Sequence, residues 1–234
     1  MNSEGEAASV QPPTGDARFR YWAAAAPLVL LLAMGAVAAS QELVRQWLIS
    51  RIEGAAASVD IVAAPTVLAR LTTAEKACDA ACGPRALAAG GAARALIAAR
   101  LPNGPRRAEL ASKASAQLRA AIAEQPESGE RWGWLAVSES ARPGDEHHRA
   151  AIAALERSYR LAPFVRELAV WRARFAGSDW AQIDRISRER ALDEVAHLTV
   201  IDPNQAQAAE DAFNGPTEAL ALDLRLSRSG AQVH

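Results

Sequence analysis

Residues 114–126 read ASAQLRAAIAEQP, residues 151–163 read AIAALERSYRLAP and residues 191–203 read ALDEVAHLTVIDP. Each stretch carries a small residue, a large aliphatic residue and a third small or aliphatic residue at the same offsets before a proline. Residues three or four positions apart share one face of an α-helix, so this spacing predicts three helices that bury equivalent faces. The positions are Ala114, Leu118 and Ala121 before Pro126, Ala151, Leu155 and Ser158 before Pro163, and Ala191, Val195 and Leu198 before Pro203.

The composition also favours helix. The chain of 234 residues is 50% hydrophobic but only 5% aromatic, and it is rich in alanine, leucine, arginine and glutamate, which are strong helix formers. The predicted fold class is therefore all-α. With 26 basic and 27 acidic side chains, the net charge is −1 and no block of one sign stands out. That balance predicts a solvated mixed-charge surface and no nucleic-acid partner.

The three proline-terminated stretches resemble the second helix of a tetratricopeptide repeat, whose period is about 34 residues. The first helix of the repeat also matches in the middle unit, where residues 132–135 read WGWL and the small residue Ala136 follows. The aromatic residue expected next is Glu139, which departs from the repeat pattern. The resemblance covers roughly residues 92–203 and implies a stack of antiparallel helix pairs.

The N-terminal part of the chain has the pattern of a membrane anchor. Residues 1–20 show no apolar period, which predicts a disordered cytoplasmic tail. Residues 21–40 read YWAAAAPLVLLLAMGAVAAS without a charged residue, and a helix of about 20 apolar residues matches the thickness of a bilayer. Tyr21 and Trp22 at one end, with Trp47 beyond the other, fit the aromatic belts of a transmembrane helix.

Two alternatives to an uncleaved anchor stay open for residues 21–40. Residues 36–38 read AVA, the small-x-small form of a signal-peptidase site, although the long acidic leading tail is atypical of a signal peptide. A buried core helix is the other alternative. Arg18 and Arg20 lie close before the segment, which favours a cytoplasmic N-terminus. We therefore expect a single-pass protein of the bacterial inner membrane with its C-terminal domain in the periplasm.

Local signals predict further elements. Residues 72–75 read TTAE, which has the form of a capping box and predicts a helix beginning there. Gly83 and Pro84 predict the end of that helix, and further helices are expected over residues 85–101 and from Pro105 onward.

The last segment has a weaker pattern. Leu220, Leu222, Leu224 and Leu226 alternate with other residues as in a β-strand, but an isolated strand is unstable. A docking segment and a frayed end both fit. The predicted organisation is a tail over 1–20, a transmembrane helix over 21–40, a juxtamembrane helix and connector over 41–71, a repeat domain over 72–203 and a C-terminal segment over 204–234.

Cys78 and Cys82 are the only cysteines. An even number of cysteines in an exported domain suggests a disulfide. Residues four positions apart on a straight helix hold their Cβ atoms about 6 Å apart, which is beyond the usual disulfide range. A helix that ends at Gly83 would let its last turn deform, so a disulfide and two free thiols both stay open.

The only dense polar cluster is residues 145–148, which read DEHH. Carboxylates and imidazoles can hold a divalent metal, but adjacent histidines on a helix diverge by about 100°. Asp145 is instead a good candidate for a helix N-cap. The sequence contains no nucleophile elbow, zinc-protease motif, phosphate-binding glycine loop or dinucleotide fingerprint. We therefore expect no catalytic residue, no metal and no cofactor.

Trp132 and Trp134 lie two positions apart, so on a helix their side chains diverge. Trp132 occupies the core position of the repeat. Trp134 either lines a partner surface or packs in an adjacent loop, and exposed tryptophan is a frequent interface anchor. Trp134, Arg131 and Trp180 are the candidate partner-binding residues.

Residues 161–180, LAPFVRELAVWRARFAGSDW, carry a narrower resemblance to proteobacterial membrane-anchored repeat proteins. Those proteins are often associated with exopolysaccharide or O-antigen assembly. The resemblance implies a non-catalytic scaffold that binds a membrane protein or an envelope complex. The alternative is an exported ligand-binding protein or enzyme with a site between helices, which requires polar groups that converge in a pocket.

Overall fold

The computed structural model describes residues 34, 39, 42, 43, 46, 47 and 50, then residues 64–78 and 83–231. The chain divides into two compact units, Met1–Trp47 and Leu48–His234, and each is described by itself. The predicted tail over residues 1–20 lies outside the described residues, as does most of the predicted span over 21–40. Within the described residues, no helix combines the length and the apolar character needed to cross a membrane.

The described residues of the first unit are helical and exposed. In the second unit, the described part of the chain forms nine helices and no strand, which confirms the all-α prediction. The helices are α2 (Ala64–Cys78), α3 (Gly83–Arg100), α4 (Pro105–Glu124), α5 (Gly129–Ser140), α6 (Asp145–Leu161), α7 (Ala169–Ser178), α8 (Arg185–Ile201), α9 (Pro203–Glu210) and α10 (Pro216–Ala231).

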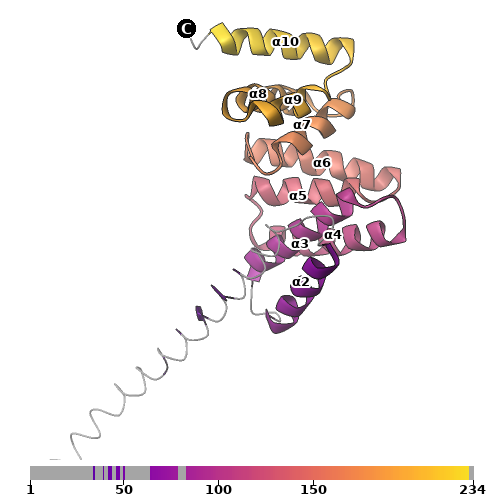
Figure 1. Cartoon of the computed structure of the whole chain (residues 1–234), viewed down its shortest axis with the longest axis vertical. Coiled ribbons are helices and arrows are strands. Elements are labelled where there is room, and N and C mark those ends of the chain that lie inside the picture. Colours follow the sequence, from indigo (N-terminus) through magenta and orange to yellow (C-terminus); the bar gives the residue numbers. More distant parts are fainter. Residues whose placement is uncertain are drawn as a thin grey trace, which may run out of the picture. The chain divides into compact units, whose positions relative to one another are not determined.

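Packing follows the order of the chain. Helix α3 packs against α4 and α5, α5 packs against α6, and α7 packs against α8 and α9. Helix α10 contacts α8. Figure 1 shows α3 to α10 succeeding one another in this order, so most contacts join elements that are close in sequence.

The repeated small–large–small pattern has the structural effect that its spacing predicts. All nine pattern positions have a relative exposure of 0%. Helices α4, α6 and α8 end at Glu124, Leu161 and Ile201, and each end lies two residues before a proline of the pattern. The N–H of the residue after each helix donates to the carbonyl of the last pattern position, with distances of 3.1, 2.8 and 2.8 Å for Ala121, Ser158 and Leu198. The three stretches therefore end alike because the same backbone groups are capped before each proline.

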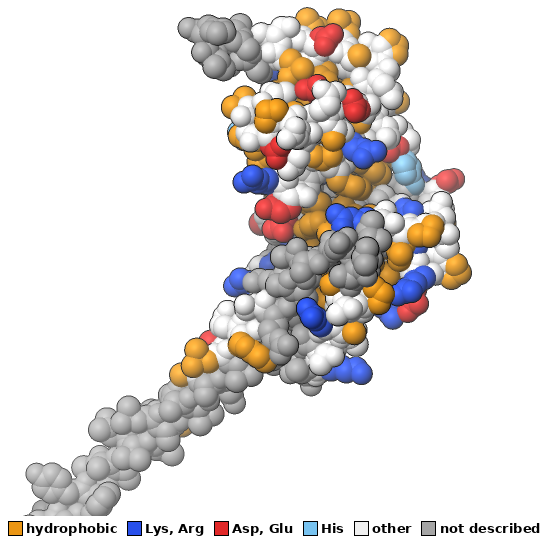
Figure 2. Space-filling model, viewed as in Figure 1, with side chains coloured by type: hydrophobic (Ala, Val, Ile, Leu, Met, Phe, Trp, Pro, Cys, Tyr) orange, Lys and Arg blue, Asp and Glu red, His pale blue; other side chains and the backbone are white. Residues whose placement is uncertain are grey.

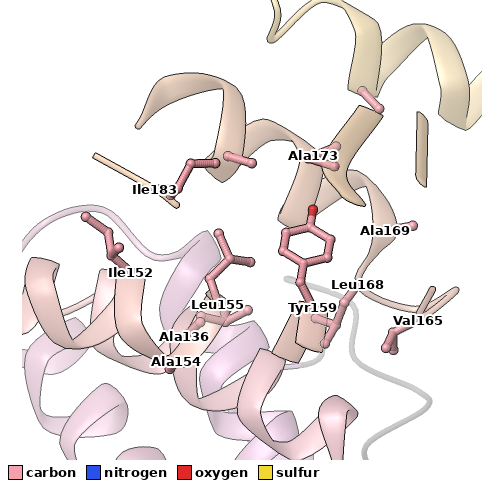
Figure 3. Close-up of a cluster of buried hydrophobic side chains, with 14 of the residues drawn as sticks. Ala136, Ile152, Ala154, Leu155, Tyr159, Val165, Leu168, Ala169, Ala173 and Ile183 are labelled. Atoms are coloured by element: carbon pink, nitrogen blue, oxygen red, sulfur yellow. The ribbon is translucent and has the colours of Figure 1, made fainter. Parts of the chain in front are cut away.

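The main core joins these helices. Figure 3 shows Leu155 and Tyr159 rising from α6, with Tyr159 directed toward Ala173 of α7. Leu168 and Ala169 lie beside them, and all five side chains are buried. Large side chains of α6 therefore fill space that small side chains of α7 leave open.

The helix predicted to begin at Thr72 begins earlier, at Ala64, so the capping-box prediction is wrong. The Thr72 and Thr73 hydroxyls donate to the carbonyl oxygens of Leu68 and Ala69, at 2.8 and 2.9 Å, as threonines do inside a helix. The extra turns exist because Leu71, at 0% exposure, packs into a core cluster with residues of α3 and α4. Helix α2 ends at Cys78, and Gly83, with a φ of 67°, begins α3 rather than ending α2.

The strand-like alternation of the C-terminal leucines lies within a helix, because residues 216–231 form α10. On a helix, residues at alternate positions fall on different faces. Leu222 is buried, whereas Leu220 and Leu224 are 61% and 52% exposed. The alternation therefore reflects an inner and an outer face of one helix.

Candidate functional site

The candidate site is a cavity of about 650 Å³ between α3 and α5. Helix α3 supplies one complete face, from Arg85 to Arg100, with alanines and Leu96 between the two arginines. Helix α5 supplies the opposite wall, and Glu167 reaches the cavity from the turn that precedes α7. An apolar floor with charged groups at its margin is the usual composition of a binding pocket.

The wall on α5 is fixed by local hydrogen bonds. Ser128 is the N-cap of α5, and its side chain accepts from the backbone N–H of Arg131 at 3.4 Å. The Trp134 indole Nε1–H donates to Glu130 Oε1 at 3.3 Å, one turn earlier on the same helix. These contacts hold the partly buried Trp134 ring at the cavity wall.

Two of the three predicted partner-binding residues, Trp134 and Arg131, line this cavity. Arg131 also has a structural contact, because its Nη1 donates to the Ala121 carbonyl at the end of α4, at 3.1 Å. Trp132 is partly buried against the core, and its Nε1 donates to the Pro126 carbonyl at 2.8 Å. Trp134 is partly buried against the same core, so the two indoles differ in their hydrogen-bond partners and in that only Trp134 lines the cavity.

The third predicted residue, Trp180, does not line this cavity. Its side chain is only 9% exposed and lies in the main core. The Phe213 ring packs edge-on against it, with the centroids 5.7 Å apart. The turn after α9 brings Phe213 to this position and so covers the tryptophan.

The cluster of residues 145–148 is divided between two neighbours. His147 Nδ1 lies 3.0 Å from Glu139 Oε2, whereas His148 Nε2 lies 2.8 Å from Asp179 Oδ1. Within the part of the chain that the structure describes, no group of His, Cys, Asp or Glu could hold a metal ion. The prediction that Asp145 is the N-cap of α6 is wrong, because Gly144 takes that position, with a φ of 106°.

Glu139, the departure from the repeat pattern, is a buried carboxylate with three basic neighbours. Its side chain is 1% exposed, and it pairs with Arg119 at 2.7 Å and Arg142 at 3.2 Å in addition to His147. The two guanidinium groups and the His147 ring compensate the cost of burying this carboxylate. They link α4, α5 and α6 where the repeat pattern would place an aromatic ring.

Sequence reasoning missed a second buried network, centred on Arg172 of α7 and Glu194 of α8. Both side chains have 0% exposure, and Arg172 Nη2 and Nε donate to Glu194 at 2.6 and 3.1 Å. The remaining donors reach Ser158 Oγ and two carbonyl oxygens of the turn after α6, at 2.9–3.1 Å. The Tyr159 hydroxyl also donates to Glu194, at 3.0 Å.

Burial shifts the pKa values of two groups in this network, Glu194 and Tyr159. Burial raises the pKa of the Glu194 carboxyl from 4.5 to about 7, although the Arg172 charge opposes that shift. Burial likewise raises the pKa of the Tyr159 phenol well above its ordinary value. The one signal in the sequence was an arginine four positions after Leu168, on the apolar stripe of α7. We assign the network to holding α6, α7 and α8 together, because all its members are buried away from the cavity.

Cys78 is the last residue of α2, and Cys82 lies outside the described residues, so a disulfide and two free thiols both stay predictions.

Figure 2 shows acidic and basic side chains interspersed over the face in view, rather than gathered in a block of one sign. The cavity lining offers an indole, alkyl groups, guanidinium groups and carboxylates, which suit non-covalent recognition. Comparison of the chain with protein families, curated proteins and solved structures finds no match.

Proposed function

We propose that this protein is a non-catalytic scaffold that binds a segment of another protein in the cavity between α3 and α5. The observation that carries the proposal is the position of Trp134 on the wall of that cavity, opposite the apolar face of α3. Tryptophan at the edge of a pocket is the residue type that most often dominates the energy of an interface.

The proposed architecture is a tetratricopeptide-like stack of antiparallel helix pairs. The burial of all nine pattern positions and the equivalent ends of α4, α6 and α8 support it. In such arrays each unit contacts mainly its neighbours, which leaves extended surfaces for binding.

We also propose that residues 21–40 anchor the chain in the bacterial inner membrane, with the helical domain in the periplasm. The uncharged sequence of that segment supports an anchor. Anchoring raises the local concentration of a partner in the same membrane, so a modest affinity suffices. The proposed context, envelope polysaccharide assembly, rests on the resemblance of residues 161–180 alone.

The test is affinity capture of the full chain in mild detergent, comparing the wild type with Trp134→Ala. Val200→Ala is the matched control, because Val200 is 72% exposed at the end of α8 and is absent from the cavity lining. We expect a specific co-purifying protein whose recovery falls at least about tenfold in Trp134→Ala and is unchanged in Val200→Ala.

Equal recovery from both variants overturns the proposed site. Recovery of a bound small molecule and no protein supports instead a ligand-binding protein or an enzyme. The cavity volume of about 650 Å³ is compatible with such a ligand.

A further inference from the structure

Helix α10 has apolar side chains on two opposite faces. Leu222 is buried on the inner face, and Arg225 pairs with Asp193 of α8 and so fixes which face is turned outward. Leu220 and Leu224 are 61% and 52% exposed, and a rotation of about 100° per residue directs both about 160° away from Leu222. Figure 1 shows α10 at the end of the series of helices, and α8 is the described element that it contacts most. The outer leucine face is therefore open to a partner.

A charged residue lies on each flank of this outer leucine face. Asp223 is rotated about 80° to one side of the centre of the face, and Arg228 about 60° to the other side. Both residues are exposed. Among the described residues, neither the Asp223 carboxylate nor the Arg228 guanidinium has a hydrogen bond or an ion pair. They do not face each other on one helix, because about 140° of rotation separates them.

These four residues have the spacing of a parallel pair of helices. In the heptad of a parallel two-stranded coiled coil, Leu220 and Leu224 take the d and a positions, which form the apolar seam. Asp223 then falls at g and Arg228 at e, the positions whose side chains form salt bridges between the two helices. Asp223 of each helix thus meets Arg228 of the other, and two ion pairs flank the leucines.

The same charges disfavour an antiparallel pair. An antiparallel pair that packs Leu220 against Leu224 of the other helix is centred on position 222. It brings the two copies of Asp223 together on one flank, where like charges repel. A second copy of this chain in parallel orientation is therefore the partner that satisfies both the leucines and the charges.

We infer that the outer face of α10 is a contact between two copies of this chain, related by a twofold axis parallel to the helix. Leu220 and Leu224 pack against the same residues of the second copy, as in an isologous interface. The ion pairs between Asp223 and Arg228 set the parallel orientation. The contact is small, so the dimer is reversible. This surface is distinct from the cavity between α3 and α5, so the inference does not depend on the proposed function.

The test is disulfide crosslinking of the full chain in mild detergent, with Cys78 and Cys82 replaced by serine and one new cysteine introduced. Residue 227 occupies the next d position, so in a parallel pair its two copies face each other. Ala208→Cys is the matched control, because Ala208 is exposed on α9. Under mild oxidation we expect Ser227→Cys to give at least about fivefold more crosslinked dimer than Ala208→Cys, because a disulfide requires close Cβ atoms.

Substitutions in the Ser227→Cys chain test the leucines and the charges separately. Leu224→Glu should lower the yield to that of the control. Asp223→Arg and Arg228→Asp should each lower the yield at least about threefold, because each places like charges on both flanks. A mixture of these two charge variants should restore the yield, because the arginines of one chain then meet the aspartates of the other.

Three results overturn the inference: a Ser227→Cys yield no higher than the control, a yield that Leu224→Glu leaves unchanged, or a mixture that crosslinks no better than either charge variant alone. Preferential crosslinking of Thr217→Cys chains to Ser227→Cys chains also overturns it, because these positions face each other only in an antiparallel pair. Trp134→Ala should leave crosslinking unchanged, so failure here is separate from failure of the cavity as a binding site. Circular dichroism verifies that each variant remains helical.

Discussion

Replacement of Arg172 by methionine tests whether the buried ion pair holds α6, α7 and α8 together. Methionine fills much of the same volume but leaves the buried Glu194 carboxylate without its guanidinium partner. It also deprives Ser158 Oγ and the carbonyls of Ala162 and Pro163 of their donor. Removing one partner of a buried pair costs about 3–5 kcal/mol, and we expect Arg172→Met to lower the free energy of unfolding by that amount.

Two further variants separate this explanation from a general effect of mutating α7. Arg174→Met makes the same change at an exposed position two residues away and should cost less than about 0.5 kcal/mol. Arg172→Met/Glu194→Met removes both charges and should be more stable than Arg172→Met alone, because no isolated charge is left buried.

The measurement is urea unfolding of the full chain in mild detergent, followed by far-ultraviolet circular dichroism. Amide hydrogen exchange shows which helices are destabilised, because a destabilised unit in a repeat array opens locally. Faster exchange should be concentrated in α6, α7 and α8. Either of two results refutes the reasoning: an Arg172→Met variant within about 1 kcal/mol of the wild type, or a double variant less stable than Arg172→Met.

Two other predictions concern pH and close packing. Because burial raises the pKa of Glu194 from 4.5 to about 7, its contribution to stability is fully present below pH 4.5 and is lost as the pH rises through 7. The free energy of unfolding of the wild type should therefore fall by about 3 kcal/mol relative to that of Glu194→Gln over this pH range. Urea unfolding at several pH values measures this difference. A difference between the two proteins that does not change with pH contradicts the raised pKa of Glu194. Gly129→Ala should destabilise by about 1–3 kcal/mol despite the higher helix propensity of alanine, because the new Cβ would lie 2.8 Å from the Ala162 backbone nitrogen. Gly104→Ala, whose Cβ meets nothing within 4 Å, is the control, and equal stability of the two variants would show that the close contact is unimportant.

The candidate site was only partly predictable. Trp134 and Arg131 could be found because a repeat motif fixed Trp132 as the core residue and thereby turned Trp134 to another face. Trp180 carried the same chemical signal, but its exposure depended on Phe213, which is distant in sequence and reaches it only through the turn after α9. The type of a residue does not indicate whether a segment later in the chain covers its side chain.

The C-terminal leucines show the same limit at the level of secondary structure. Their alternation matched a strand, yet packing of Leu222 against the core selected a helix. Period-two patterns over a few residues fit both structures, and burial decides between them.

The sequence by itself determined the class of fold and the ends of α4, α6 and α8. Those features depend on residues three to five positions apart and on a following proline, so local geometry specifies them. Only the tertiary structure decided which charged residues are buried together and which helix faces form the cavity. Arg172 meets Glu194 across many intervening residues, and the face of α3 lines one cavity with Trp134 of α5. Both arrangements depend on how the helices pack rather than on any spacing along the chain.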